Sequence, residues 1–153
     1  MAETRFEPLD PAFDQRVRAS FARQTAMATL GVELAEVAPG RVVLQMPWAA
    51  RLTQQHGFLH GGVIGAALDS ACGYAASSLM AADVGVLSIE YKVSFLAPAR
   101  GERFRVVGEV VKAGRNLSFS EARAYAIDGG REKLVATMSS TLMSVAGRDD
   151  VKH

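Results

Sequence analysis

The stretch TQQHGFLHGGVIGAALDSA, residues 53–71, places two histidines and a glycine pair directly before a run of small and apolar residues. The run continues to about residue 82, is too long for an ordinary strand and is rich in Ala and Leu, so we expect a helix over 61–82. This helix is apolar nearly all round, and one flat sheet would leave part of it uncovered. A strongly curved sheet wrapped around it would bury most of it, and a second copy of the chain would bury the rest.

The segments around this helix complete one α+β domain over residues 1–153. Asp10 and Pro11 are helix-start residues, and an amphipathic pattern follows them, which predicts an N-terminal helix over about 10–28. Two strand-like runs come next, and four more follow the central helix. Consecutive strands favour an antiparallel sheet over parallel βαβ units. Residues 147–153 are expected to be a frayed tail.

The first strand after the central helix, SIEYKVSFL at 88–96, alternates between apolar and polar residues. A regular strand turns successive side chains to opposite faces. The pattern therefore predicts that Ile89, Tyr91, Val93 and Phe95 share one face and that Ser88 lies on the other.

Overall charge gives no indication of a nucleic-acid or membrane partner, because 17 basic residues nearly balance 16 acidic ones. The single cysteine indicates a reducing compartment, and the first ten residues lack a secretory pattern. We therefore expect a cytoplasmic protein. Residues 63–82 are long enough to span a bilayer, but an acid in the middle of that segment favours a buried helix instead.

Gly61 and Gly62 stand where the central helix should begin. The first N–H groups of a helix have no intrahelical partner and carry partial positive charge. With no Cβ in the way, a bound anion or a carbonyl oxygen that gains negative charge can approach them closely. The alternative is that the glycines only permit a tight turn, and the residues alone leave both readings open.

Asp69 is the one carboxylate in the apolar run, which holds no Lys or Arg to pair with it. Burial of an unpaired carboxylate is costly. It predicts a proton held more tightly than usual, a hydrogen-bond partner from another element, or a water-filled pocket. Each of these suits a general base or a nucleophile. The alternative is an Asp that faces solvent or caps a loop.

His56 and His60 have the i, i+4 spacing of half a zinc site, but no third ligand is evident, so we expect no metal. His60 is instead expected to orient the glycine turn or to line the pocket, and His56 to be structural. Cys72 lies in an apolar stretch without a basic neighbour, which indicates a protonated thiol that packs as a small hydrophobic residue.

The stretch GFLHGGVIGAALDSACGYAA resembles the PaaI-like acyl-CoA thioesterases of the hotdog superfamily. Their motif corresponds here to Gly57, His60, Gly61, Gly62 and Asp69. SIEYKVSFLAPA and the last two strand segments extend the resemblance over about 25–145. It implies a hotdog fold, in which a curved antiparallel sheet wraps a long helix, and assembly into homodimers and often homotetramers.

The resemblance also implies the hydrolysis of medium- or long-chain or aryl acyl-CoA thioesters, with no cofactor. Gly61 N–H would polarise the thioester carbonyl, and Asp69 from the other chain would act as base or nucleophile. Ser88 falls where some members hold the attacking water. Many relatives carry Asn at the position of Gln54, and either Gln54 or Gln55 is expected to take over its role.

Substrate contacts are expected from Gly62, Gln55, Phe58 and Arg115. Basic side chains near strand ends are candidates for the phosphates of coenzyme A, namely Arg100, Arg103, Lys112 and Arg115. Two other functions remain open, a non-catalytic acyl-CoA-binding module and a hotdog hydratase or dehydratase.

Overall fold

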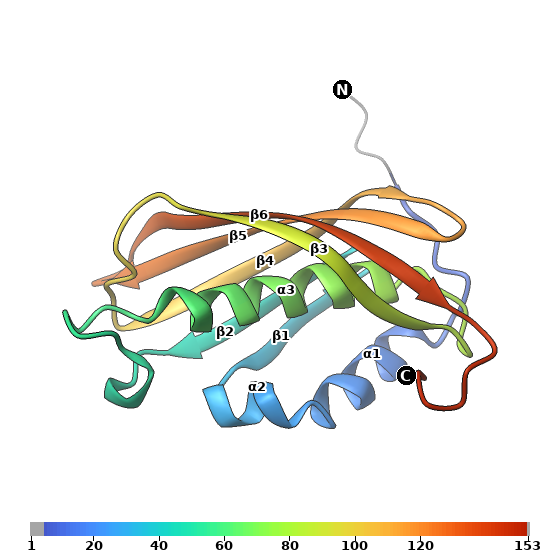
Figure 1. Ribbon diagram of the computed structural model, residues 1–153, viewed down its shortest axis with the longest axis horizontal. Helices are drawn as coiled ribbons and strands as arrows, with labels where there is room; N and C mark the ends of the chain where they lie inside the picture. Colours follow the sequence, from blue (N-terminus) through green and yellow to red (C-terminus); the bar gives the residue numbers. More distant parts are fainter. Residues whose placement is uncertain (1–4, 153) are drawn as a thin grey trace.

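The computed structural model describes residues 5–152 and has the α+β hotdog architecture that the sequence predicts. Its six strands are all antiparallel, in the order β1-β2-β4-β5-β6-β3, and they curve around the helix α3, Gly61–Ser77 (Figure 1). The strands are β1 Glu33–Ala38, β2 Arg41–Pro47, β3 Gly85–Phe95, β4 Arg103–Ala113, β5 Leu117–Asp128 and β6 Arg131–Val145.

The N-terminal segment forms two helices, α1 (Phe13–Ala22) and α2 (Thr25–Leu30), where the sequence predicts one. The chain leaves helical geometry at Gln24, with φ −80° and ψ 89°. The Asp10 carboxylate accepts a hydrogen bond from Ala12 N–H in the turn before α1, so the helix begins later than Pro11. Both helices lie beside β1 (Figure 1).

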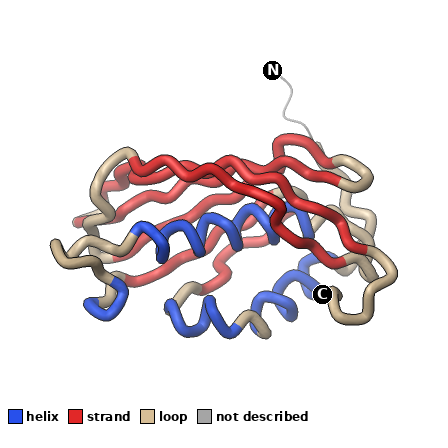
Figure 2. Tube along the Cα trace, viewed as in Figure 1, coloured by secondary structure: helices blue, strands red, loops and turns tan. Residues whose placement is uncertain are grey.

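The centre of the core is a close contact between α3 and the inner face of the sheet (Figure 2). Ala67, Ala71 and Ala75 of the helix are completely buried. On β4, a Cβ added at Gly108 would lie 2.4 Å from the Ala71 carbonyl oxygen. Only glycine therefore fits at this point, and small residues on both elements set the depth of the helix in the sheet.

Helix α3 ends at Ser77, five residues before the predicted end. The guanidinium of Arg16, on α1, donates hydrogen bonds to Ser77 Oγ at 3.2 Å, Ser77 O at 3.1 Å and Met80 O at 3.0 Å. It also forms an ion pair with Asp10 at 2.8 Å, and both side chains are largely buried. A cation from elsewhere in the fold thus satisfies the carbonyl groups at the helix C-terminus.

Strand β3 is an edge strand with a β-bulge at Ile89. Ser88 pairs with buried Leu142, whereas Glu90 pairs with Thr141, so one extra residue lies between the two pairs. The bulge turns Ser88 towards α3, on the same face as Phe95, and the prediction that alternation places Ser88 on the opposite face is wrong.

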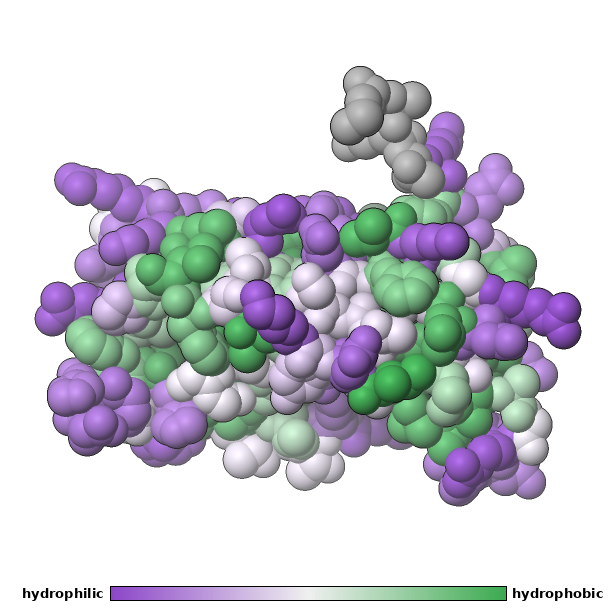
Figure 3. Space-filling view, turned by 45° about the horizontal axis from the view of Figure 1, so that its top comes forward, coloured by the Kyte–Doolittle hydropathy of each residue, from purple (hydrophilic) through white to green (hydrophobic). Residues whose placement is uncertain are grey.

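The side of the molecule seen in Figure 3 carries hydrophobic surface towards both of its ends, with hydrophilic side chains between them. Ile89, Tyr91 and Phe95 of β3 are each at least half exposed. Exposed apolar groups along an unpaired strand edge are typical of a surface that another chain covers. None of the helices within residues 5–152 combines the length and hydrophobicity needed to cross a bilayer.

Candidate functional site

The turn into α3 leaves one backbone donor available. His60 is the N-cap residue, and its Nδ1 accepts a hydrogen bond of 2.9 Å from Gly62 N–H. Because Nδ1 is the acceptor, it carries no proton in this arrangement. Within residues 5–152, the N–H of Gly61 has no hydrogen-bond acceptor. His60 therefore caps the helix, and Gly61 presents the free N–H at its positive end.

An apolar cavity of about 570 Å³ lies next to this donor. Gly61 and Ile64 contribute its α3 wall, Phe58 its loop wall, and Phe95 its β3 wall. The Phe95 ring packs so closely that a Cβ added at Gly61 would lie 2.9 Å from its Cζ. The absence of a side chain at Gly61 is therefore part of the shape of the cavity.

The same cavity distinguishes the two glutamines. Gln54 lines it, whereas Gln55 is exposed and does not. The Gln54 Oε1 accepts a hydrogen bond from His56 N–H, which leaves its amide NH₂ group as a donor for the cavity. Gln55 Nε2 lies 3.4 Å from His56 Nε2, outside the cavity. Gln54 and Gly61 thus both line one apolar pocket, and each carries an N–H group.

Asp69 has the partner that its burial requires. Ser88 Oγ donates a hydrogen bond of 2.7 Å to Asp69 Oδ1, and the carboxylate is half-buried between α3 and β3. Asp69 lies eight residues after Gly61 in the same helix. At 1.5 Å per residue this separates them by about 12 Å along the axis. The structure therefore joins Ser88 to Asp69 by a hydrogen bond and places Gln54 and Gly61 on one cavity, but keeps the two pairs apart within one chain.

Cys72 is one turn beyond Asp69 and is completely buried. Burial, with smaller contributions from the Asp69 and Glu121 carboxylates, raises the pKa of its thiol to about 12. The thiol stays protonated at neutral pH and is a poor nucleophile.

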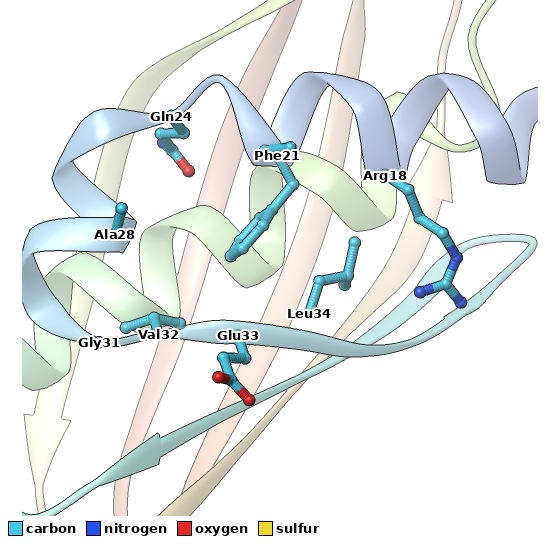
Figure 4. Close-up of a pocket in the computed structure, with 9 residues that line it drawn as sticks. Arg18, Phe21, Gln24, Ala28, Gly31, Val32, Glu33 and Leu34 are labelled. Atoms are coloured by element: carbon cyan, nitrogen blue, oxygen red, sulfur yellow. The ribbon is translucent and has the colours of Figure 1, made fainter.

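Arg115 lies outside the pocket of Gly61. It lines a separate cavity of about 590 Å³ at the opposite end of α3, so one chain does not bring it to the other predicted site residues. A third cavity, of about 460 Å³, lies between α1, α2 and β1 and contains none of the predicted site residues (Figure 4). Among residues 5–152, no three His, Cys, Asp or Glu side chains are grouped to hold a metal ion.

Sequence reasoning missed the contributions of Leu96, Val135 and Ala136 to the apolar cavity. Val135 and Ala136 are in β6, about 75 residues from Gly61, and nothing in their local pattern separates a cavity wall from ordinary core. Their role follows from the pairing of β3 with β6, which places Ala136 opposite Phe95.

Comparison with known proteins gives one consistent family. A family model described as Thioesterase superfamily matches residues 56–133. A solved structure of a thioesterase family protein from Silicibacter pomeroyi is 56% identical, with a TM-score of 0.87 over 88% of this chain and 99% of that one.

More distant relatives agree with this result. Human acyl-coenzyme A thioesterase 13 is 29% identical over 92 residues, which are 58% of this chain and 64% of that protein. The PaaI protein from the phenylacetic acid degradation operon of E. coli shares the fold, with a TM-score of 0.79 at 19% identity over 88% of this chain and 94% of that one. The predicted resemblance to PaaI-like hotdog thioesterases is confirmed.

Proposed function

The chain belongs to the thioesterase superfamily, and from this premise we propose that it hydrolyses acyl-CoA thioesters in the cytoplasm to a free acid and coenzyme A. The name of the human relative supports acyl-CoA as the substrate class. The apolar cavity beside Gly61 suits a medium- or long-chain or aryl-acyl group, because its lining within the described residues carries no charged side chain.

The active site requires two copies of the chain. This proposal rests on the separation of about 12 Å between Gly61 and Asp69 along one rigid helix. Because of this distance, the two residues of one chain cannot both reach the same carbonyl carbon. Strand β3 is at an edge of the sheet and has one unpaired side. Its Ser88 is hydrogen-bonded to Asp69, so this edge strand lies next to the acid. Antiparallel pairing of two β3 edges about a twofold axis would place each acid near the glycine turn of the other chain.

In this arrangement, the N–H groups of Gly61 and Gln54 donate to the thioester oxygen as it gains negative charge. Asp69 of the partner subunit either takes a proton from a water that attacks the carbonyl carbon, or attacks that carbon itself. In the second route the acyl group is left on Asp69 as an anhydride, which a water then hydrolyses to the free acid and the original carboxylate. The hydroxyl of Ser88 holds the carboxylate in position and supports the water. Coenzyme A then leaves as a thiolate, whose conjugate acid has a pKa of about 8.5, so no strong general acid is needed.

A second contact is expected to join dimers into a tetramer. A row of three apolar side chains crosses neighbouring strands, because Met143 of β6 pairs with Leu117 of β5 on one side and with Leu87 of β3 on the other. Their exposed fractions are 38% for Met143, 38% for Leu117 and 43% for Leu87. Such a row on the outer face of the sheet supports a further protein contact. Sedimentation at micromolar concentration should give a dimer or tetramer, and an active monomer would contradict the proposed site.

The decisive experiment measures thiol release from a panel of acyl-CoAs. Asp69→Asn should abolish turnover while substrate still binds, and Asp83→Asn, an exposed acid beyond α3, should leave it unchanged. Tight binding without hydrolysis by the wild type would indicate a binding module. Hydration of an enoyl double bond without thiol release would indicate a hydratase.

Subunit mixing tests the shared site directly. Asp69→Asn and Gly61→Pro chains, each with about 1% of wild-type activity or less alone, should regain about a quarter of that activity when unfolded and refolded together at equal amounts, since half of the dimers then hold one intact site. No recovery from verified mixed dimers would mean that each chain carries a complete site.

A further inference from the structure

A charged groove adjoins the apolar cavity. It has a volume of about 670 Å³, lies between the β3–β4 connection and the β5–β6 turn, and shares two lining residues with the cavity, Phe58 and Pro98. Whereas the described lining of the cavity has no charged side chain, the groove contains three cations, Arg100, Arg131 and Lys133. One continuous surface therefore changes from apolar to basic at Phe58.

The three cations are free to meet a ligand. Within residues 5–152, none of Arg100, Arg131 and Lys133 forms an ion pair with a carboxylate. Exposed cations are often only solvated, so it is the gathering of three around a single groove, none of them held by a carboxylate, that leaves room for an anion.

The acidic residues of the groove do not cancel this charge. Glu132 receives two hydrogen bonds from the Arg105 guanidinium, at 2.9 and 2.7 Å, and these hold the pKa of Glu132 below its ordinary value. Asp128 is the one remaining carboxylate in the described lining. The groove thus presents three unpaired positive groups against one unpaired negative group.

Arg100 is also placed at the boundary between the two spaces. Its guanidinium carbon lies 5.7 Å from the centre of the Phe58 ring, within the range of a cation–π contact. This contact keeps the charge beside the entrance to the apolar cavity, where a ligand with an apolar part and an anionic part would have its junction.

Resting on the proposed function, we infer that this groove binds the phosphates of coenzyme A. The diphosphate and 3′-phosphate contact Arg100, Arg131 and Lys133, and the acyl and pantetheine parts pass Phe58 into the apolar cavity. The planar guanidinium groups can each contact two phosphate oxygens. The groove then selects coenzyme A esters over thioesters that lack the nucleotide, whereas the cavity selects the acyl group.

The test compares two substrates with the same acyl group, a coenzyme A ester and a pantetheine ester without phosphates, on Arg100→Gln, Arg131→Gln and the double variant. Hydrogen bonds between charged groups contribute enough that each single change should raise KM for the coenzyme A ester about tenfold. The kcat for this ester and all constants for the pantetheine ester should stay within about twofold, because neither arginine touches the reacting carbonyl.

Arg23→Gln is the matched control, since Arg23 lies at the end of α1 on the side of β1 and lines neither space. The KM for the coenzyme A ester should also rise with salt in the wild type and less so in the double variant. An unchanged KM in the double variant, or an equal loss on both esters, would overturn the assignment.

Calorimetric titration with coenzyme A itself separates this proposal from the proposed function. Weaker binding to the double variant supports the groove even if no thioester is hydrolysed. If the double variant hydrolyses thioesters normally and binds coenzyme A with unchanged affinity, the groove does not bind the phosphates, whereas the proposed hydrolysis is still supported.

Discussion

The N–H of Gly61 can be removed without breaking the helix that presents it. Gly61 is the first residue of α3, where its N–H has no intrahelical acceptor and where proline is well tolerated. The residue before a proline must be extended, and His60 already has φ −61° and ψ 136°. Gly61→Pro should therefore fold, keep the His60 cap on Gly62 N–H, and lose the proposed donor to the thioester oxygen.

The size of the effect follows from the number of donors. Removal of one oxyanion donor typically costs about 2.7–4 kcal/mol, or a factor of about 10²–10³ in kcat. Because the Gln54 amide lines the same cavity and can still donate, we expect a loss near the lower end, about a hundredfold. The KM should change far less than kcat, since the hydrogen bond strengthens mainly in the transition state.

Gly61→Ala is the steric control. Both substitutions add a Cβ, which would lie 2.9 Å from Phe95 Cζ unless that ring moves, but alanine keeps the N–H. The assay is steady-state release of coenzyme A, detected with a thiol reagent, together with circular dichroism to check the fold. A kcat for Gly61→Pro within about threefold of that for Gly61→Ala would refute the role of this N–H, because a lost donor costs far more.

Three further results are expected. Ser88→Ala should lower kcat about tenfold or more by removing the hydroxyl that positions Asp69, whereas Ser94→Ala on the same strand should not, and equal effects would argue against a special role for Ser88. Arg16→Ala should lower the free energy of unfolding by about 2–4 kcal/mol in urea titration, because the carbonyl groups at the end of α3 lose their partner, and a loss below about 0.5 kcal/mol would show that water replaces it. Cys72 should resist alkylation at pH 8 until the protein unfolds, since burial holds its pKa at about 12, and rapid labelling of the folded protein would contradict this.

The sequence could predict the fold because its strongest signals are long and regular. The apolar run after Gly61 is continuous over four turns, and the alternating segments after it are of strand length, so the central helix and the antiparallel sheet follow from pattern alone. The end of α3 could not be predicted in this way. It depends on Arg16, some 60 residues away, whose local pattern is that of an ordinary polar position on a helix.

In the candidate site, too, some features follow from the local sequence and others depend on contacts between distant residues. Gly61 and Asp69 can be chosen as candidates from the local sequence, because an isolated acid and paired glycines are unusual around a buried helix. The orientation of Ser88 is not, because the bulge at Ile89 depends on pairing with β6. The choice between Gln54 and Gln55 likewise depends on the hydrogen bond from His56 N–H, a feature of loop geometry that residue types do not reveal.

The distance between Gly61 and Asp69 explains why two chains suit this chemistry better than one. A carboxylate in the first turn of α3 would accept hydrogen bonds from the free N–H groups of its own helix and would neutralise the donors that the thioester oxygen needs. Eight residues further along, Asp69 is beyond their reach and is held instead by Ser88 on the edge strand. In the proposed dimer, the acid of one chain and the N–H donors of the other lie on opposite sides of the substrate. The acid and the donors therefore do not hydrogen-bond to each other, and both can act on the carbonyl group that lies between them.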